Sequence, residues 1–273
     1  MRTNVSATIS MTTSAGAAQL AFMVAVARVP GLAVQEALTV TLDGEPQRVV
    51  ELAAAHHGRV HVVDLPPATR YDQTLTLTYD AGVEGGPADD VETPRTELLT
   101  YLRPSRYAES DRLLATARSE FRGLTGRELL AAVAGWVGQH LTYVTGSSRG
   151  TDGAVETLLD RRGVCRDYAH LVIALLRSLD VPARLAAVYA PGLAPMDFHA
   201  VAEAWVDGAW HVVDATLLAP RSSLVRIATG RDAADTAFLS SYGAPIRMGR
   251  LLVTAVVDGD LPTDDLAELV RLP

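Results

Sequence analysis

Short runs of alternating polar and apolar residues dominate the first eighty positions of the chain. Thr74 to Tyr79 alternate cleanly, and residues 37–42 and 59–63 form shorter runs of the same kind. A period of two is typical of β-strands with one buried face, and Asp43-Gly44 and His57-Gly58 suit the turns between them. The pattern therefore predicts a meander or sandwich of short antiparallel strands.

A stretch rich in glycine, proline and acidic residues follows at positions 81–96. Such a composition is typical of a loop or linker. We therefore expect a domain boundary between this stretch and Pro104. It divides the chain into an N-terminal β-rich domain, residues 1–100, and a second domain, residues 101–273.

Helical periodicity begins after this linker. The expected helices cover residues 110–122, 125–141, 151–162 and 165–179, and Pro182 follows the last of them. Strands are expected at 184–189, 199–206, 210–215 and 251–257, and Thr263 can cap a last short helix that reaches residue 270. Helices followed by an antiparallel sheet predict an α+β fold for this half.

The composition narrows the classes of function. The 273 residues carry 24 Lys and Arg against 32 Asp and Glu, a net charge of −8, which argues against nucleic acid or an anionic membrane as the main partner. The single cysteine cannot form an internal disulfide, and no run approaches the roughly 18 apolar residues of a membrane span. Since the N-terminus also lacks a convincing signal-peptide layout, a cytoplasmic location is expected.

Neither a metal nor an organic cofactor is expected. His56, His57 and His61 lie close together in the sequence, but they lack the acidic or thiolate neighbours of a typical metal site. No segment resembles a phosphate-binding glycine loop or a calcium loop.

The chemistry of the chain centres on its single cysteine. Cys165 follows Gly163 and Val164, where the fourth helix is expected to begin. Unpaired N–H groups and the helix dipole favour negative charge there, and a nearby imidazolium favours it further, so a thiolate nucleophile fits this position. The same N–H groups can donate to an oxyanion. The alternative is a core cysteine on a buried helix.

A hairpin places a histidine near an aspartate. Asp207-Gly208 suits a two-residue turn, which makes Val206 oppose Ala209. Counting back along both strands, Val201 opposes Asp214, and His199 becomes a diagonal neighbour of Asp214 on the same face, about 7–8 Å away at the backbone. The opposite face carries small apolar residues suited to core packing, namely Ala200, Ala202, Ala204 and Val206.

Several segments, in order, resemble the bacterial transglutaminase-like family. They are Gly163 to Leu171, Val181 to Arg184, Asp197-Phe198-His199-Ala200 and Trp210 to Thr216, with Arg103 to Tyr107 and Gly230 to Asp235 as further recurrent segments. The resemblance covers residues 100–245, and the β-rich front half resembles the region that often precedes this domain.

This resemblance implies a papain-like core, with the cysteine at a helix N-terminus and the histidine and aspartate on adjacent strands. Residues 101–273 are then the catalytic domain, Cys165 the nucleophile, His199 the base and Asp214 the residue that orients the imidazole. Two positions depart from the pattern. Ala108 stands where bacterial relatives often have a second cysteine, which makes a redox pair impossible, and Ala215 stands where many have proline.

Three other residues are candidates for the site. Acyl transfer needs an oxyanion donor besides the Cys165 amide, and Trp136 or Tyr143 could supply it. Trp136 is better explained as a core residue of its helix, so we prefer Tyr143. Glu203 shares a strand face with His199 and either lines the cleft or is solvated.

We therefore expect a cysteine-dependent acyl-transfer enzyme that acts on a peptide or carboxamide through a thioester, with water or an amine as acceptor. Its partners would be a peptide, a protein or a small amide. The alternative is a peptide-binding or scaffolding module that keeps the papain-like shape with little catalysis. The residues leave the substrate and the oligomeric state open.

Overall fold

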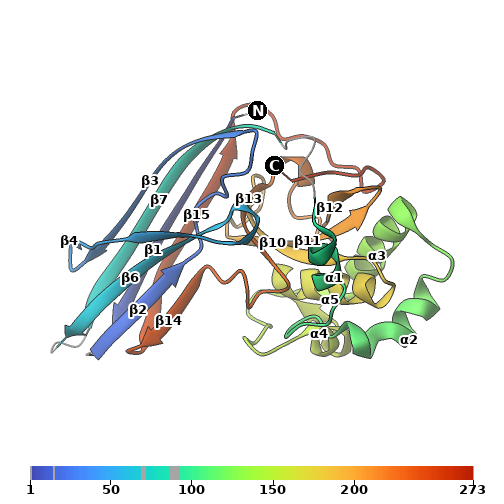
Figure 1. Cartoon of the computed structure of the whole chain (residues 1–273), viewed down its shortest axis with the longest axis horizontal. Coiled ribbons are helices and arrows are strands. Elements are labelled where there is room, and N and C mark those ends of the chain that lie inside the picture. Colours follow the sequence, from blue (N-terminus) through green and yellow to red (C-terminus); the bar gives the residue numbers. More distant parts are fainter. Residues whose placement is uncertain (1, 15, 69–71, 87–92, 273) are drawn as a thin grey trace.

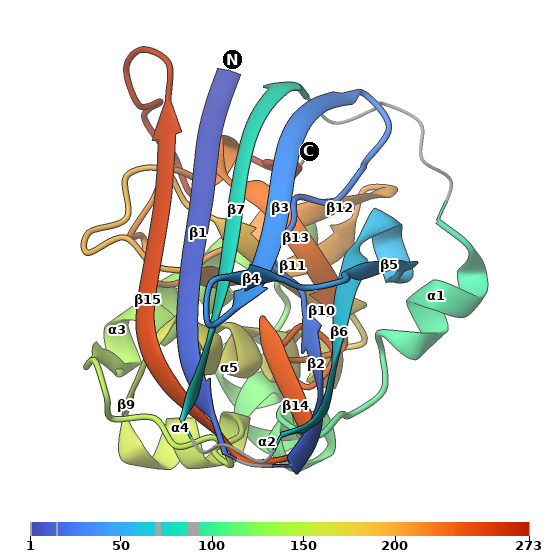
Figure 2. The same ribbon diagram turned by 90° about the vertical axis from the view of Figure 1, so that its left-hand side faces the viewer.

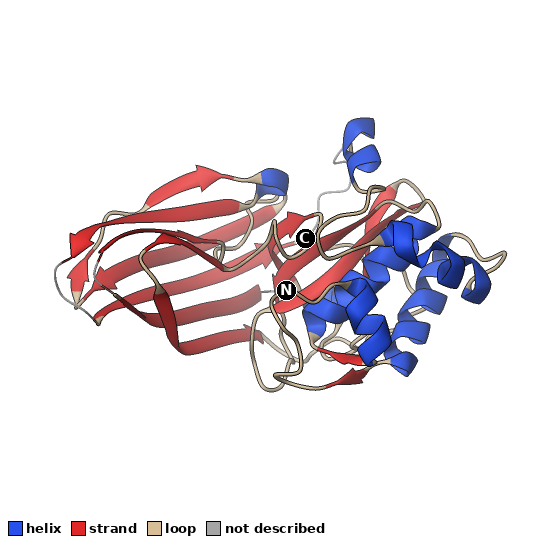
Figure 3. Ribbon diagram, turned by 90° about the horizontal axis from the view of Figure 1, so that it is seen from below, coloured by secondary structure: helices blue, strands red, loops and turns tan. Residues whose placement is uncertain are grey.

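The computed structural model describes residues 2–14, 16–68, 72–86 and 93–272. A β-sandwich forms one part of the molecule, and helices packed on a smaller sheet form the other (Figures 1 and 3). Within the described residues, no helix is long and apolar enough to cross a membrane.

Two antiparallel sheets form the sandwich. The first has the order β15 (Ile246–Val257), β1 (Arg2–Thr13), β7 (Gln73–Gly85), β3 (Leu32–Leu42) and β4 (Glu45–Pro46), as Figure 2 shows face-on. The second has the order β14 (Leu239–Gly243), β2 (Gly16–Phe22), β6 (Arg59–Ala68) and β5 (Val50–Ala53).

Alternation along the strands builds the sandwich core. Every second residue of β1 from Val5 to Met11 is buried. In β7, the alternate residues Leu75, Leu77 and Tyr79 are buried in the same way. These side chains lie between the two sheets, while the residues between them face outward. The predicted sandwich is therefore confirmed.

The far end of the chain completes this sandwich. The predicted strand at 251–257 is present within β15, but its assignment to the second-half sheet is wrong, because β15 pairs with β1. The strand β14 likewise pairs with β2. Inner-face residues such as Val253 and Ala255 join the sandwich core. The division at residue 100 stays a prediction, although strand pairing crosses it.

The expected loop at 81–96 begins too early. Because Ala81 and Val83 continue the buried alternation, β7 runs to Gly85. Positions 87–92 of that prediction lie outside the described residues. A short helix that the sequence pattern did not predict, α1 (Arg95–Thr100), then leads into the second part.

The second part confirms the predicted α+β arrangement. Its four further helices are α2 (Ser110–Glu120), α3 (Gly126–His140), α4 (Ala154–Asp160) and α5 (Cys165–Ser178). The antiparallel sheet has the order β12 (Ala209–Val213), β11 (His199–Val206), β10 (Ala183–Tyr189) and β13 (Val225–Gly230). A two-residue parallel bridge joins β8 (Thr142–Tyr143) to β9 (Arg162–Gly163).

The helix α5 is the centre of this part. Apolar residues from all its faces are buried, and they share one core with Ala202, Ala204 and Val206 of β11. This is the strand face that the hairpin argument assigned to core packing.

The predicted helix from Thr263 to residue 270 is wrong. The carboxylate of Asp264 accepts hydrogen bonds from the Arg221 guanidinium, of the short turn η2 (Arg221–Ser223), and the carbonyl of Asp265 accepts another. Farther along, the Val270 carbonyl accepts from the N–H of Val212. These tertiary contacts hold the segment outside a regular helix.

A buried ionic network joins the strands behind the site. The Glu203 carboxylate, with no exposed surface, accepts from Arg184 Nε at 2.8 Å and from Arg226 Nη2 at 2.7 Å. Burial alone would raise the pKa of Glu203, but the two guanidinium groups hold it far below its usual value. Arg184 also donates to Glu97 of α1 at 2.9 Å, so the network ties β10, β11, β13 and α1 together.

We predict that Glu203→Gln lowers the free energy of unfolding by about 3 kcal/mol or more, because it leaves two buried cations without their shared anion. Urea denaturation followed by circular dichroism measures this. Glu45→Gln, on the exposed strand β4, is the matched control. Equal stability of the two variants would contradict the role of the network.

Candidate active site

Cys165 is the first residue of α5, and its side chain is partly exposed. The buried Asp167 fixes this end of the helix by accepting the N–H of Val164 at 2.9 Å. Its other oxygen accepts from Ser148 Oγ at 2.9 Å and from Arg166 Nη2 at 3.2 Å. Asp167 thus both caps the helix and pairs with an arginine, and it holds the thiol in place.

Gly163 is required by close packing. A Cβ at this position would lie 2.7 Å from the Cβ of Asp167 and 2.9 Å from Oδ2. Real Cβ atoms do not approach so closely, so any side chain here would push Asp167 away from its capping position.

The hairpin forms in the predicted register. Trp205 pairs with Trp210 and Glu203 pairs with Val212, and the ladder ends at Ala202 and Val213. His199 begins β11, and Asp214 follows the last residue of β12. Both side chains are buried, and His199 Nε2 lies 2.9 Å from Asp214 Oδ2, so the predicted contact is present.

The electrostatics of this pair favour an imidazolium. Burial lowers the pKa of His199, but the Asp214 carboxylate outweighs it and, with the Cys165 thiol, raises the pKa of His199 to about 10. Burial raises the pKa of Asp214, but interaction with His199 and hydrogen bonds from Thr216 lower it overall. The ion pair is therefore the stable state at neutral pH.

The nitrogen that serves Cys165 follows by elimination. Asp214 occupies Nε2, and Nδ1 is buried without a hydrogen-bond partner among the described residues. The thiol nevertheless acts on the imidazole strongly enough to raise its pKa. Nδ1 is thus the atom that can take the thiol proton, and such contacts often tighten only when substrate binds.

Thr216 orients the aspartate, a role that the sequence reasoning missed. Asp214 Oδ1 accepts from the N–H of Thr216 at 2.8 Å and from its Oγ1 at 2.7 Å. An aspartate two residues before a threonine is typical of a local turn of this kind, so the Asp214-Ala215-Thr216 segment carried the signal. Oδ2 is left for His199.

Tyr143 lies beside the nucleophile. The β8–β9 bridge pairs Tyr143 with Gly163, two residues before Cys165. Burial, together with the neighbouring Cys165 thiol, raises the pKa of Tyr143 to about 12. The phenol is therefore uncharged and able to donate.

Two other candidates have different roles. Trp136 donates its indole N–H to Glu120, the last residue of α2, at 3.0 Å and stacks on His140 of its own helix. It is therefore not an oxyanion donor in this arrangement. Glu203 does not line a cleft, because Arg184 and Arg226 bury and neutralise it.

The two further family-like segments meet at α5. The Asp232 carboxylate accepts the N–H of Tyr107 at 2.9 Å, and the Tyr107 ring stacks on His170 of α5. The buried Arg177 donates to the carbonyls of Arg103 and Arg231. These segments support the helix that carries the cysteine.

We predict that Gly163→Ala destabilises the fold by about 1–3 kcal/mol through overpacking, and also slows alkylation of Cys165 by displacing Asp167. Gly150→Ala is the control, since a Cβ there meets nothing within 4 Å. Urea denaturation and intact mass after iodoacetamide treatment measure the two effects. A Gly163→Ala protein that matches the control in both would disprove the packing argument.

Comparisons with known proteins identify relatives of this chain. A sequence profile of the transglutaminase-like superfamily matches residues 115–215, which include Cys165, His199 and Asp214. The structure of a candidate cysteine protease from Cytophaga hutchinsonii is 32% identical, covers 98% of this chain and 96% of its own, and superposes with a TM-score of 0.87. The periplasmic domain of TgpA from Pseudomonas aeruginosa is 20% identical over 76% of this chain and 91% of its own, with a TM-score of 0.40.

An uncharacterized protein of Mycobacterium leprae is 27% identical over 148 residues, which is 50% of this chain and 52% of that protein. The chain thus spans about half the length of this curated relative. The near-complete match to the Cytophaga hutchinsonii protein and the profile match at the site agree on the family. The chain belongs to the transglutaminase-like superfamily.

Proposed function

We propose that the protein is a cysteine-dependent acyl-transfer enzyme that cleaves a peptide or carboxamide bond through a thioester. The observation that carries the proposal is the buried His199–Asp214 pair at 2.9 Å beside a partly exposed cysteine at a helix N-terminus. This is the arrangement of nucleophile, base and orienting acid that covalent catalysis requires.

The reaction follows from these positions. In the resting enzyme Nδ1 of the His199 imidazolium holds the proton that the Cys165 thiol has lost, and the thiolate attacks the carbonyl carbon to form a tetrahedral intermediate. The intermediate expels the amine, which takes its proton from the imidazolium, and leaves a thioester on Sγ. Water or a second amine then loses its proton to His199 and attacks the thioester. The thiolate leaves, and an acid or a new amide is released.

We assign the oxyanion site to the Cys165 N–H and the Tyr143 hydroxyl. Both lie at the N-terminus of α5, where the helix dipole favours negative charge. Since Tyr143 stays protonated at neutral pH, it can donate to the oxygen of the tetrahedral intermediate.

Hydrolysis is the outcome that we favour over transamidation. Water is always present, and the nucleophile Cys165 is partly exposed to it. The Cytophaga hutchinsonii relative, a candidate cysteine protease, supports the same choice. The peptide-library experiment below determines whether water or an amine is the acceptor, and which substrate side chains are accepted.

Alkylation of Cys165 tests the catalytic pair. We predict that at pH 6–7 the wild-type thiol reacts with iodoacetamide at least about tenfold faster than in His199→Ala, because the imidazolium stabilises the thiolate. The difference should shrink as pH rises toward about 10, where His199 loses its proton. Intact mass gives the rate, since Cys165 is the only cysteine.

His57→Ala, on an exposed turn, is the matched control for this experiment and should react like the wild type. If the wild-type protein and His199→Ala react alike across the pH range, the pair is not assembled. The binding-module alternative would then replace the enzyme.

A peptide library tests the acyl transfer itself. We predict that the wild type generates new peptide termini, that Cys165→Ala and Asp214→Asn generate few, and that Tyr143→Phe lowers kcat by about a hundredfold. Mass spectrometry with and without an added primary amine separates hydrolysis from transamidation. Neither new termini nor amine adducts from a wild type with a reactive Cys165 would contradict the proposed activity.

A further inference from the structure

The strand β15 forms an open edge of the first sheet. It pairs with β1 on one side, and its other side makes no backbone hydrogen bond to any described residue. Figure 2 shows it as the outermost strand of that sheet. A row of unpaired N–H and C=O groups is a template for another strand.

The edge of β15 lacks the features that usually prevent an edge strand from pairing with another chain. The run from Leu251 to Val257 contains no charge and no proline. On its outward face, Leu252 is 45% exposed and Val256 is 52% exposed. The strand is irregular at Gly249 and Arg250, between the residues that pair with Ile9 and Met11, so the regular edge begins at Leu251. An exposed apolar edge of seven residues is unusual in a protein that stays monomeric.

We propose that β15 is a homodimerisation edge, and that two copies of this chain pair antiparallel across a two-fold axis at Thr254. The two five-stranded sheets then form one continuous sheet, and the axis relates identical surfaces, as closed dimers require. The proposal stands apart from the proposed function, because β15 belongs to the sandwich and α5 to the other part (Figure 1).

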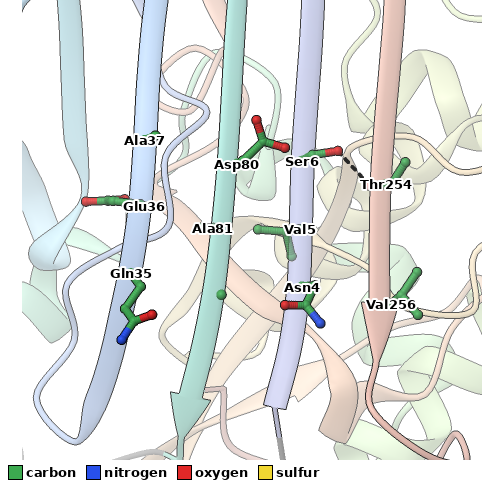
Figure 4. A pocket seen from close by; sticks show the side chains of 11 residues that line it. Asn4, Val5, Ser6, Gln35, Glu36, Ala37, Asp80, Ala81, Thr254 and Val256 are labelled. Atoms are coloured by element: carbon green, nitrogen blue, oxygen red, sulfur yellow. Dashed lines mark hydrogen bonds between the residues drawn. The ribbon is translucent and has the colours of Figure 1, made fainter.

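The strand β15 is complementary to a second copy of itself. This favours a second copy of the chain as the partner, and it also favours one register of pairing. With Thr254 opposite itself, Leu252 faces Val256 of the second copy, and Arg250 faces its Asp258. Thr254 and Asp258 belong to the outward face, because Asn4 on that face donates to Asp258 and Thr254 shares a hydrogen bond with Ser6. Leu252 and Val256 are exposed on the same face, and Arg250 lies at the irregular start of the strand. Figure 4 shows Thr254 and Val256 on β15 at the border of the shallow hollow on this face.

Other registers fit less well. Directly opposite residues of an antiparallel pair point to the same face, so the axis can move only in steps that keep outward residues opposite outward residues. Moving it to Val253 makes Val256 face Arg250, and moving it to Ala255 makes Leu252 face Asp258. Of these three positions, only the axis at Thr254 places apolar residues opposite apolar residues and also places a positive charge opposite a negative charge.

Sedimentation velocity on the full chain tests the association. At 0.15 M salt, which screens the repulsion between two copies of net charge −8, the wild type should shift from 29.0 kDa toward twice that mass as its concentration rises. Leu252→Lys and Val256→Lys should each weaken dimerisation at least tenfold. Leu52→Lys, equally exposed on β5 of the other sheet, is the matched control and should leave it unchanged.

Charge reversal tests the register. Arg250→Asp and Asp258→Arg should each weaken the dimer, and the double variant should restore it, since the opposite charges face each other again. In a Cys165→Ser background, Thr254→Cys should form a disulfide-linked dimer on mild oxidation, because this residue faces its own copy. Thr8→Cys, on the interior strand β1, should not.

A wild type that stays at 29.0 kDa at all concentrations would overturn the proposal. So would a dimer that survives both lysine variants, because another surface would then carry it. Cys165 alkylation in the lysine variants should match the wild type, which separates a lost dimer from a lost fold. If the enzyme proposal fails but the dimer forms, this inference is unaffected.

Discussion

Burial of α5 from Asp167 to Ser178 is the constraint on which the active part of the molecule depends. A buried helix cannot leave its terminal N–H and C=O groups to water, so protein groups must satisfy them. Asp167 does so at the first turn, and at the last turn Asp180, in the left-handed region, lets the N–H of Val181 reach the Leu176 carbonyl. The position of Cys165 follows from these two ends.

The site places a second buried ion pair, His199 and Asp214, in the same part of the molecule. The imidazolium of His199 and the carboxylate of Asp214 would be costly to bury singly, and each is tolerable because it meets the other at 2.9 Å. Thr216 supplies two hydrogen bonds to the remaining carboxylate oxygen. The result is a preorganised imidazolium that stabilises the Cys165 thiolate without solvent rearrangement.

The sandwich is connected to this part through more than the chain. Glu203, Arg184 and Arg226 form an ionic cluster within the small sheet, and Arg184 extends it to Glu97 of α1. His56 of the turn η1 (Ala55–His57), which precedes β6 of the sandwich, contacts Tyr101 at 2.6 Å at the edge of the same cluster. Glu203, which the sequence left as a candidate to line the cleft, is therefore structural, because its cluster extends to the place where the two parts meet.

The sequence by itself determined the features that depend on local chemistry. The turn at Asp207-Gly208 and the parity of a strand place His199 near Asp214, and the start of helical periodicity after Gly163 places Cys165 at a helix start. Only the tertiary structure decided the rest. The pairing of β15 with β1, the fate of Glu203 and Trp136, and the loss of the helix after Thr263 all depend on partners far away in the chain. Those partners are Val5, Arg226, Glu120 and Arg221, and no local pattern encodes such distant contacts.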